Sequence, residues 1–572
     1  MSTLPIERYL QIRHASLAGL LPDGTIAYLA DTTGLEQLWL IAGDGIHEQL
    51  SFGSERVTGA LCSPTAPLVV IARDVGGNEK HALAAIDATT GAERPLTDDA
   101  TAMHVPGAFS PDGAHLAITH TGRNGADFDV ALIDLASGAR RELAQPGGWT
   151  RVVDWHDAGI LALRAETPFN HDLFLIDPAS GASRHLTPHA GEVAYESAHL
   201  LPDGGVVCAC DEGSEFMRLA ELHDGKIRFL TLDDADVESI ALDRPRTRRA
   251  VVTNRRGSSE VAVDGLLLAS SGMGIAGGVE FGPDDQIALT MASASDTADV
   301  WTVAPELRRR TRSAVGGLDR HSFVAPTLHE VESFDGRRIP YFLFGEPGQP
   351  TMCWVHGGPE SQFRPSMAAV IQYLCAHGVT VAAPNVRGST GYGRTYHHLD
   401  DVARRLDSVA DLAALARELG ASSGTPVGVI GGSYGGYMTM AAITEHPELW
   451  SAAVNIVGIV NFVTFLENTS AYRRALREAE YGSLEHDREL LASISPIHKV
   501  DRIRCPLMVI HGANDPRVPV DEAEQVVEAL RARSHPVEYL RYEDEGHGIT
   551  RLANRLDCYP RVVRFLEKHL PC

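Results

Sequence analysis

The sequence lacks the features that would send the chain into or through a membrane. No apolar stretch is long enough to cross a bilayer as a helix. Met1–Leu20 carries the charges of Glu7, Arg8 and Arg13 and has no sustained apolar core, so it is neither a signal peptide nor a membrane anchor. We therefore expect no membrane partner.

Cysteine is also scarce, with eight residues in a chain of 572. Several of them, such as Cys208, Cys353 and Cys375, stand inside apolar runs that are typical of strands. Cysteines in such positions behave as small core residues and stay reduced, whereas a disulfide framework belongs to short secreted chains. This usage indicates a cytoplasmic protein.

Positive charge is in the minority, with 50 Lys and Arg residues against 75 Asp and Glu residues and a net charge of −25 at pH 7. An excess of this size repels nucleic acid, which is therefore not expected as a partner. The sequence also has no His-Glu-x-x-His pair, no Cys-x-x-Cys and no Gly-Lys-Ser/Thr phosphate loop, so we expect no metal and no cofactor. His356 and His511 stand at predicted strand ends, where a hydrogen-bonded structural histidine is expected.

The first half of the chain contains a repeat of turn signals at a spacing of about 39 to 47 residues. Alternating, strand-like stretches such as His115–Thr119 follow them. This is the length of a four-stranded propeller blade, and short strands with glycine turns suit radial stacking of sheets. A pair of β-sandwiches is the alternative, but its turns would lack a blade-length period. Seven signals predict seven blades: Leu21–Gly24, Ser63–Thr65, Ser110–Gly113, His156–Gly159, Leu201–Gly204, Asp243–Pro245 and Gly282–Asp284.

In the second half, Gly431–Gly435 reads Gly-Gly-Ser-Tyr-Gly and stands between the apolar run Val427–Ile430 and the helix-like stretch Tyr437–Thr444. Strand, sharp turn and helix in this order form a nucleophile elbow, whose crowded backbone requires glycine at the flanking positions. The turn lifts the central hydroxyl clear of the sheet edge. Ser433 is therefore the candidate nucleophile.

A serine hydroxyl needs a base and an orienting acid, and both follow in the chain order that this elbow requires. About 80 residues on, the strand-like run Leu507–His511 leads to Asp515, and about 30 residues further Val537–Tyr542 leads to His547. We expect His547 to take the proton from Ser433 while an ionised Asp515 fixes the imidazole tautomer. Each motif alone also fits an ordinary turn, but three in order, each after a strand, favour a catalytic triad.

The negative charge that develops on a substrate carbonyl needs hydrogen-bond donors. The elbow supplies the backbone N–H of Tyr434, directly after the nucleophile. A second donor is expected where the strand-like run Met352–Val355 ends in His356–Pro359, which reads His-Gly-Gly-Pro. We predict Gly358 for this role, with Gly357 as the second choice. A plain strand-exit turn is the alternative.

With these motifs the chain resembles the prolyl oligopeptidase family of serine peptidases, and within it the acylaminoacyl-peptidase branch. The resemblance covers nearly everything after residue 325. It implies an α/β-hydrolase domain with a doubly wound, mostly parallel sheet, whose catalytic face is covered by the seven-bladed β-propeller. The motifs that carry the resemblance are His356–Pro359, Asn385–Gly393, Gly431–Met438, Asn514–Pro519 and Gly546–Gly548.

These patterns divide the chain into three parts. Residues 20–314 are predicted to form the propeller and residues 315–572 the hydrolase domain, with the linker in the arginine-rich passage Arg308–Gly317. Residues 1–19 are left as an N-terminal segment, in which Ile6–Ile12 has the apolar spacing of a short helix. By the resemblance, this segment packs on the hydrolase domain.

The resemblance also implies substrate-binding residues. In acylaminoacyl peptidases the arginine two places after the catalytic aspartate helps to bind substrate, and the matching residue here is Arg517; a surface or loop-bracing arginine is the alternative. The family builds the wall of its S1 pocket in the region of Gly458–Ser470. We therefore predict Val460, Phe462 and Phe465 as pocket residues, with ordinary helix core as the alternative.

Two departures refine the resemblance. The His-Gly-Gly-Pro segment carries no tyrosine of the kind that prolyl oligopeptidase uses near its oxyanion loop, which favours the acylaminoacyl-peptidase branch with backbone donors. The sequence also shows no convincing paired-glutamate motif of the kind with which dipeptidyl peptidases hold a free N-terminus. This weakens the interpretation as a specialised dipeptidase.

We therefore predict a serine peptidase that cleaves short peptides or (acyl)aminoacyl amides through an acyl-enzyme, with the propeller restricting access. An esterase or amidase acting on non-peptide acyl compounds is the first alternative, because triad chemistry does not distinguish an ester from an amide. A catalytically inactive propeller scaffold is the second. The sequence leaves a homo-oligomer open.

Overall fold

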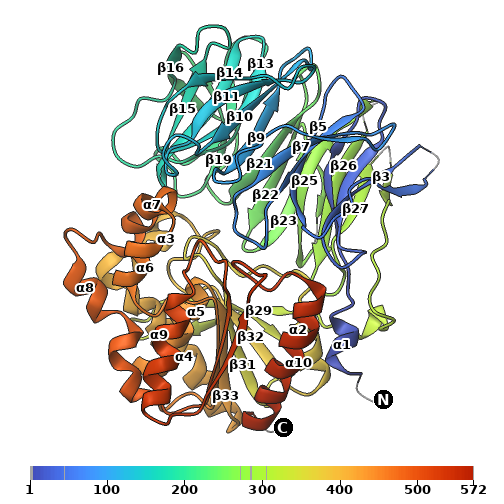
Figure 1. The fold of residues 1–572 in the computed structure, drawn as a ribbon. Helices are drawn as coiled ribbons and strands as arrows, with labels where there is room; N and C mark the ends of the chain where they lie inside the picture. The colour runs from blue at the N-terminus through green and yellow to red at the C-terminus, as the bar shows by residue number, and fades with distance from the viewer. Residues whose placement is uncertain (1–3, 44, 271, 284–285, 304–305, 571–572) are drawn as a thin grey trace.

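The computed structural model describes residues 4–43, 45–270, 272–283, 286–303 and 306–570. Seven four-stranded antiparallel sheets form a ring in the first half of the chain, and one eight-stranded sheet with flanking helices forms the second half. Figure 1 shows the ring lying against one edge of the large sheet. The predicted fold, a seven-bladed β-propeller with an α/β-hydrolase domain, is confirmed.

Each blade is built from four strands that are consecutive in the chain. Blades one to four comprise β1 (Ala15–Leu20), β2 (Ile26–Ala30), β3 (Gln37–Ile41), β4 (His47–Gln49); β5 (Val57–Cys62), β6 (Leu68–Arg73), β7 (Ala82–Asp87), β8 (Glu93–Pro95); β9 (His104–Phe109), β10 (His115–His120), β11 (Asp129–Asp134), β12 (Arg140–Ala144); β13 (Trp149–His156), β14 (Gly159–Thr167), β15 (Asn170–Ile176) and β16 (Ser183–His185). Blades five to seven comprise β17 (Tyr195–Leu200), β18 (Val206–Cys210), β19 (Arg218–His223), β20 (Lys226–Phe229); β21 (Asp236–Leu242), β22 (Arg249–Arg255), β23 (Ser258–Val263), β24 (Leu266–Ser270); β25 (Gly274–Phe281), β26 (Ile287–Ser293), β27 (Asp299–Val303) and β28 (Leu307–Arg309).

All seven turn signals fall at the same place in the blade, between its first and second strands. In the first blade, for example, Gly24 closes the turn with a φ of +85°, a conformation that glycine adopts without strain. The signal is therefore preceded by one strand of its own blade, and the first blade begins at Ala15. This differs from the expected start at residue 20, because the turn marks the first hairpin and not the first strand. Asp284 of the seventh signal lies outside the described residues.

The ring closes between the first and seventh blades without exchange of a strand. The amide of Leu17 donates to the Thr290 hydroxyl at 2.8 Å, and the amide of Leu20 donates to a carboxylate oxygen of Glu280 at 3.0 Å. These bonds satisfy inner-strand amides that have no strand partner at the junction. Side chains of the last blade therefore join the two ends of the propeller.

The N-terminal helix α1 (Ile6–Tyr9) lies on the hydrolase domain. Tyr9 packs edge-on against Tyr373 with ring centroids 5.5 Å apart, and Leu10 is fully buried. From α1 the chain enters the propeller beside the segment by which it later leaves the propeller. The Arg13 amide donates to Ala314 O at 2.7 Å, and Ile12 and Val315 form an isolated antiparallel β-bridge. The two connections between the domains therefore run side by side (Figure 1).

The large sheet has the order β29-β30-β32-β31-β33-β34-β35-β36, in which β30 is antiparallel to both of its neighbours and all other pairs are parallel. Its strands are β29 (Thr327–Glu332), β30 (Arg338–Phe344), β31 (Thr351–Val355), β32 (Thr380–Pro384), β33 (Val427–Gly432), β34 (Ala452–Ile456), β35 (Leu507–Gly512) and β36 (Val537–Tyr542). Its helices are α2 (Ala369–Ala376), α3 (Arg394–His397), α4 (Arg405–Ser423), α5 (Tyr434–Glu445), α6 (Phe462–Asn468), α7 (Ala471–Tyr481), α8 (Arg488–Ser493), α9 (Asp521–Ala532) and α10 (Leu552–His569).

Helices on the two faces of the sheet form separate cores. One face is covered by α4, α5 and α9, and the other by α2 and α10 together with α1 (Figure 1). The carboxyl ends of the parallel strands meet at one sheet edge, and the loops that follow β35 and β36 contact the propeller. Within the described part of the chain, no helix combines the length and the apolar character needed to span a membrane.

The junction of the propeller allows a test of pH dependence. Burial raises the pKa of Glu280 to about 7, whereas the pKa of a glutamate in an unfolded chain is about 4.3. Between these values the folded state holds a proton that the unfolded state has lost, so Glu280 makes stability fall as pH rises from about 4.3 through about 7. The loss of thermal stability between about pH 5 and about pH 8 should therefore be smaller in Glu280→Gln than in the unchanged protein.

The matched control is Glu306→Gln, which changes an exposed glutamate of the same blade. Denaturation midpoints of the three proteins at both pH values measure the effect. A Glu280→Gln variant with the same pH dependence as the unchanged protein would contradict the assignment.

Candidate active site

The predicted nucleophile elbow is present between β33 and α5. Ser433 has φ +57° and ψ −121°, a strained conformation for a residue with a side chain. A Cβ at Gly431 would lie 2.2 Å from Gly435 O, and one at Gly435 would lie 2.3 Å from Val355 O. Since such distances are below any real carbon contact, both glycines are required for the turn that carries Ser433.

Asp515 and His547 are joined by a hydrogen bond of 2.7 Å between Asp515 Oδ2 and His547 Nδ1. The other oxygen of Asp515 accepts the backbone amides of Arg517 and Val518 at 2.9 and 3.0 Å. Burial is the largest single influence and opposes the ionisation of Asp515, but His547, His511 and the Val518 amide together outweigh it, so the pKa of Asp515 is lowered from its ordinary value. An ionised carboxylate that fixes Nδ1 leaves Nε2 of His547 as the basic nitrogen.

Ser433, Asp515 and His547 follow the carboxyl ends of β33, β35 and β36, which lie at the same edge of the sheet. The structure links Asp515 to His547, but among the described residues it gives no hydrogen bond between Ser433 and His547. Catalytic hydrogen bonds are often long without substrate and shorten when the site is filled. The triad therefore stays a prediction: the contact between Asp515 and His547 is formed, and the one between His547 and Ser433 is not.

The glycines after β31 lie directly against the nucleophile. A Cβ at Gly357 would be 3.4 Å from Ser433 Cβ and 4.0 Å from its Oγ. In the part of the chain that the structure describes, no hydrogen bond uses the amides of Tyr434, Gly357 or Gly358. These N–H groups are thus available to a developing oxyanion, and Gly358 stays the predicted second donor beside Tyr434.

Helix α7 supports this glycine loop. Arg477 Nη1 donates to Glu360 Oε2 at 2.8 Å, and the Tyr481 hydroxyl lies 3.5 Å from Gly358 O. Glu360 stands two residues after Gly358, so its ion pair with Arg477 fixes the loop of Gly358 to α7. The sequence carried a signal for Glu360, since it follows the His-Gly-Gly-Pro motif directly, but none for its partner.

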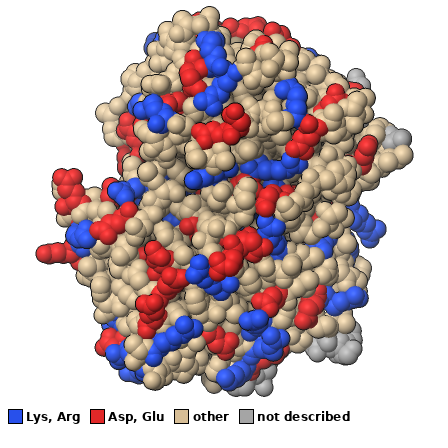
Figure 2. Space-filling view, in the orientation of Figure 1, with Lys and Arg blue, Asp and Glu red and all other residues tan. Residues whose placement is uncertain are grey.

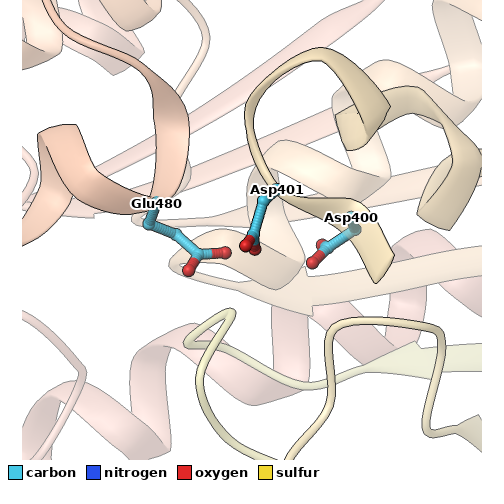
Figure 3. A group of neighbouring side chains, drawn as sticks. All are labelled: Asp400, Asp401 and Glu480. Carbon is cyan, nitrogen blue, oxygen red and sulfur yellow. The ribbon is translucent and has the colours of Figure 1, made fainter. Parts of the chain in front are cut away.

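The carboxylates of Asp400, Asp401 and Glu480 lie close together (Figure 3). Asp400 accepts the hydroxyl of Tyr434, the residue after the nucleophile. Of the described residues, these are the group whose oxygens lie close enough for a metal ion. The fully buried Arg405 already bridges two of them, since it bonds to Asp400 and donates to Glu480 Oε1 at 2.6 Å. It also lies 3.1 Å from the Tyr434 hydroxyl. The guanidinium supplies the positive charge here, so we assign the cluster to support of the elbow.

The second blade of the propeller touches the catalytic loops. A Cβ at Gly77 would lie 2.6 Å from Gly546 N and 2.9 Å from Gly546 Cα, so the two backbones are in direct contact. Gly546 immediately precedes His547. The Asn514 side chain, next to Asp515, donates to Gly76 O at 3.2 Å. The loop between β6 and β7 therefore limits the position of the catalytic histidine and aspartate.

Arg517, the predicted substrate-binding arginine, forms an ion pair with Glu79 of the same propeller loop at 2.5 Å. Glu79 also accepts the Tyr472 hydroxyl at 3.0 Å. These contacts fit the alternative role of Arg517, in which it braces the loop between β6 and β7 against the hydrolase domain. Its side chain is 43% exposed, so a role in substrate binding stays a prediction.

The predicted pocket residues lie in the hydrophobic core. Val460 and Phe462 are 0% exposed and Phe465 is 3% exposed. The Phe462 ring packs against Tyr437 and Tyr481, with centroids 4.6 and 4.7 Å apart. Side chains enclosed in this way offer no surface to a substrate, so the structure corrects the pocket assignment and supports the helix-core alternative.

His356 and His511 are buried and hydrogen-bonded, as expected for structural histidines. Nε2 of His356 pairs with the Ser389 hydroxyl at 2.9 Å, and burial lowers the pKa of His356 to about 4. Nε2 of His511 donates to Val518 O at 2.8 Å. The His511 bond holds the loop of Asp515, and the His356 bond joins the start of the glycine loop to Ser389.

The contact between Gly77 and Gly546 can be tested with a matched pair of substitutions. Gly77→Ala should slow labelling of Ser433 by a fluorophosphonate probe by about tenfold or more, because the new methyl group displaces the loop of His547. Gly91→Ala, in the same blade, is the control: Gly91 has a similar φ, +70° against +77°, but no atom lies within 4 Å of its Cβ position. Equal labelling rates in the two variants would show that the contact does not position His547.

Comparisons with known proteins agree with this geometry. A sequence model of the prolyl oligopeptidase family matches residues 365–571, and a model of the N-terminal domain of acylamino-acid-releasing enzyme-like proteins matches residues 60–299. Dipeptidyl aminopeptidase BIII of Pseudoxanthomonas mexicana is 26% identical over 93% of this chain and 84% of its own length. The acylamino-acid-releasing enzyme of Homo sapiens is 27% identical over 39% of this chain and 31% of its own.

Solved structures share the fold. A puromycin-hydrolyzing peptidase of Mycobacterium tuberculosis has a TM-score of 0.86 at 18% identity and covers 100% of this chain and 98% of its own. An acylaminoacyl peptidase of Pyrococcus horikoshii has a TM-score of 0.77 at 17% identity, covering 99% and 98%. With the elbow in place, the hydrolase domain matches the prolyl oligopeptidase family of serine peptidases over residues 365–571.

Proposed function

We propose that the protein hydrolyses short peptides or (acyl)aminoacyl amides, with Ser433, Asp515 and His547 as its catalytic triad. The observation that carries this proposal is the 2.7 Å hydrogen bond from His547 Nδ1 to the buried Asp515, at the sheet edge that also carries the strained Ser433. The arrangement supplies a nucleophile, a base and an orienting acid in the order of the family.

The reaction would use these groups in two steps. His547 Nε2 takes the proton of Ser433 as Oγ attacks the scissile carbonyl, and the amides of Tyr434 and Gly358 stabilise the oxyanion. His547 then protonates the leaving amine, and an acyl-enzyme remains on Ser433. Water, activated by the same imidazole, releases the acyl group and restores the hydroxyl. Asp515 stays ionised throughout and stabilises the imidazolium.

The propeller would select substrates by access. It lies over the sheet edge that carries the predicted triad, so a peptide must reach Ser433 through the ring or between the domains (Figure 1). Large folded proteins would be excluded, and short peptides admitted. Acidic and basic side chains are mixed over the face shown in Figure 2, and we propose no nucleic-acid partner.

Several substrate classes fit the same chemistry. The likeness to a dipeptidyl aminopeptidase and to acylamino-acid-releasing enzymes makes both free and blocked N-termini candidates. An esterase or amidase acting on non-peptide compounds is the second candidate function, since the triad treats both bonds alike. A cytoplasmic location also belongs to this proposal, supported by the seven cysteines of the described residues, which are all free.

The nucleophile can be tested directly. Ser433→Ala should lower turnover by a factor approaching about 10⁶ with the fold unchanged, because the triad acts as a unit. Turnover should be measured on aminoacyl anilides, dipeptidyl anilides, N-acetyl-aminoacyl anilides and simple esters, with the unchanged protein as reference. A loss below about tenfold on every substrate would mean that another residue is the nucleophile.

The same panel separates the alternatives. Preferential cleavage of the anilides supports the peptidase, whereas activity confined to the esters supports the esterase. Failure of a fluorophosphonate probe to label Ser433 in the unchanged protein would leave the inactive scaffold.

A further inference from the structure

Helix α7 begins beside the loop of Asp515. The amide and the hydroxyl of Ser470 both donate to Pro516 O, at 3.2 and 2.8 Å. Arg473 lies in the first turn, and its amide donates to Ser470 O at 2.8 Å. The base of the Arg473 side chain is therefore tied to the segment that follows the predicted catalytic aspartate.

The direction of the Arg473 side chain follows from the helix. Residues four apart lie on the same face, one turn from each other, so Arg473 shares a face with Arg477. Arg477 reaches Glu360 in the glycine loop, and Tyr481, a further turn on, reaches Gly358 O. The face of α7 that carries Arg473 therefore looks toward the loop of Gly358, which is predicted to supply an oxyanion donor.

This face also lies at the boundary of the two domains. The neighbouring Tyr472 packs against Phe128 and Trp149 of the propeller, with ring centroids 5.9 and 5.8 Å apart. Its hydroxyl donates to Glu79. Arg473 is thus placed where a peptide that enters between the domains would pass.

The charges around Arg473 do not balance. Arg477 is paired with Glu360, and Arg517 is paired with Glu79. Arg473 is half-buried, yet no hydrogen bond or ion pair of its guanidinium is found among the described residues. Burial, followed by the Arg517 and Arg477 guanidinium groups, lowers the pKa of Arg473. Three cations share two carboxylates at this place.

A partly buried charge without a partner is costly, and a site that keeps one is prepared for a ligand of opposite charge. The planar guanidinium matches a carboxylate, which it can bind with two parallel hydrogen bonds. The ligand that must come to this place is the substrate. In a peptide, a carboxylate is supplied by an acidic side chain or by the C-terminus.

We infer that Arg473 binds a carboxylate of the peptide substrate and makes the enzyme selective for peptides that carry one near the scissile bond. This inference rests on the proposed peptidase function and names the substrate class for the same site. Glu79 and Glu360 neutralise Arg517 and Arg477, so the excess positive charge at this place is that of Arg473.

The test compares substrates that differ only in this charge. One pair of peptides has Glu or Gln at the same position next to the scissile bond, and a second pair ends in a free carboxylate or an amide. For the unchanged protein, kcat/KM should be about tenfold or more higher for the acidic member of at least one pair. The pair that shows the preference tells the side-chain carboxylate from the C-terminal one.

Arg473→Gln should lower this ratio to about 1. Arg473→Lys, which keeps the charge but not the planar fork, should give an intermediate ratio. The matched control is Arg474→Gln: Arg474 is the next residue of α7, and its guanidinium donates to Glu467 O at 2.7 Å. This variant should retain the ratio of the unchanged protein.

The outcomes separate this inference from the proposed function. A ratio near 1 in the unchanged protein, or the same ratio in Arg473→Gln, overturns the inference while peptide cleavage stands. An equal fall for acidic and neutral peptides in Arg473→Gln assigns Arg473 to the scaffold and also overturns it. No cleavage of any peptide overturns the proposed function.

A binding measurement makes the inference testable without turnover. In the Ser433→Ala background, calorimetry should give tighter binding of the acidic peptide than of its neutral partner. The added change Arg473→Gln should remove that difference. Equal binding of the two peptides before the added change overturns the inference.

Discussion

The carboxyl edge of the large sheet meets the propeller at a point where two backbones touch with no side chain between them. Gly77 lies on one side of Gly546, and on the other side a Cβ at Gly512 would be only 2.2 Å from Gly546 O. The loop of His547 is held between its own domain and the second blade. The distance that the imidazole must cover to reach Ser433 is therefore set by both domains, and the geometry of the site belongs to neither domain alone.

Helix α7 provides a second route between the same parts. Its first turn packs Tyr472 on the propeller, its middle holds Glu360 through Arg477, and its last turn supplies Glu480 to the buried Arg405. One continuous helix of 11 residues thus joins the propeller to the glycine loop and to the support of the elbow. Substrate selection at Arg473 and oxyanion binding would depend on the same element.

Features with a local physical cause could be predicted from the sequence. The turn of each blade uses a glycine or a proline, and the elbow needs Gly431 and Gly435, so both leave a signal in neighbouring residues. The contact of Gly76 with Asn514 joins residues 438 positions apart, and nothing near either residue announces it. Phe462 was ambiguous for another reason, because a pocket wall and a core position both require an apolar side chain.

The paired connections at Arg13–Ala314 and Ile12–Val315 have a mechanical meaning. Both covalent crossings between the domains lie on one side of the molecule, and α7 lies on the opposite side (Figure 1). If the two domains moved apart, the propeller would rotate about a hinge formed by these two adjacent connections. Such a rotation would separate the domains most on the far side, where Tyr472 of α7 packs against Phe128 and Trp149 of the propeller.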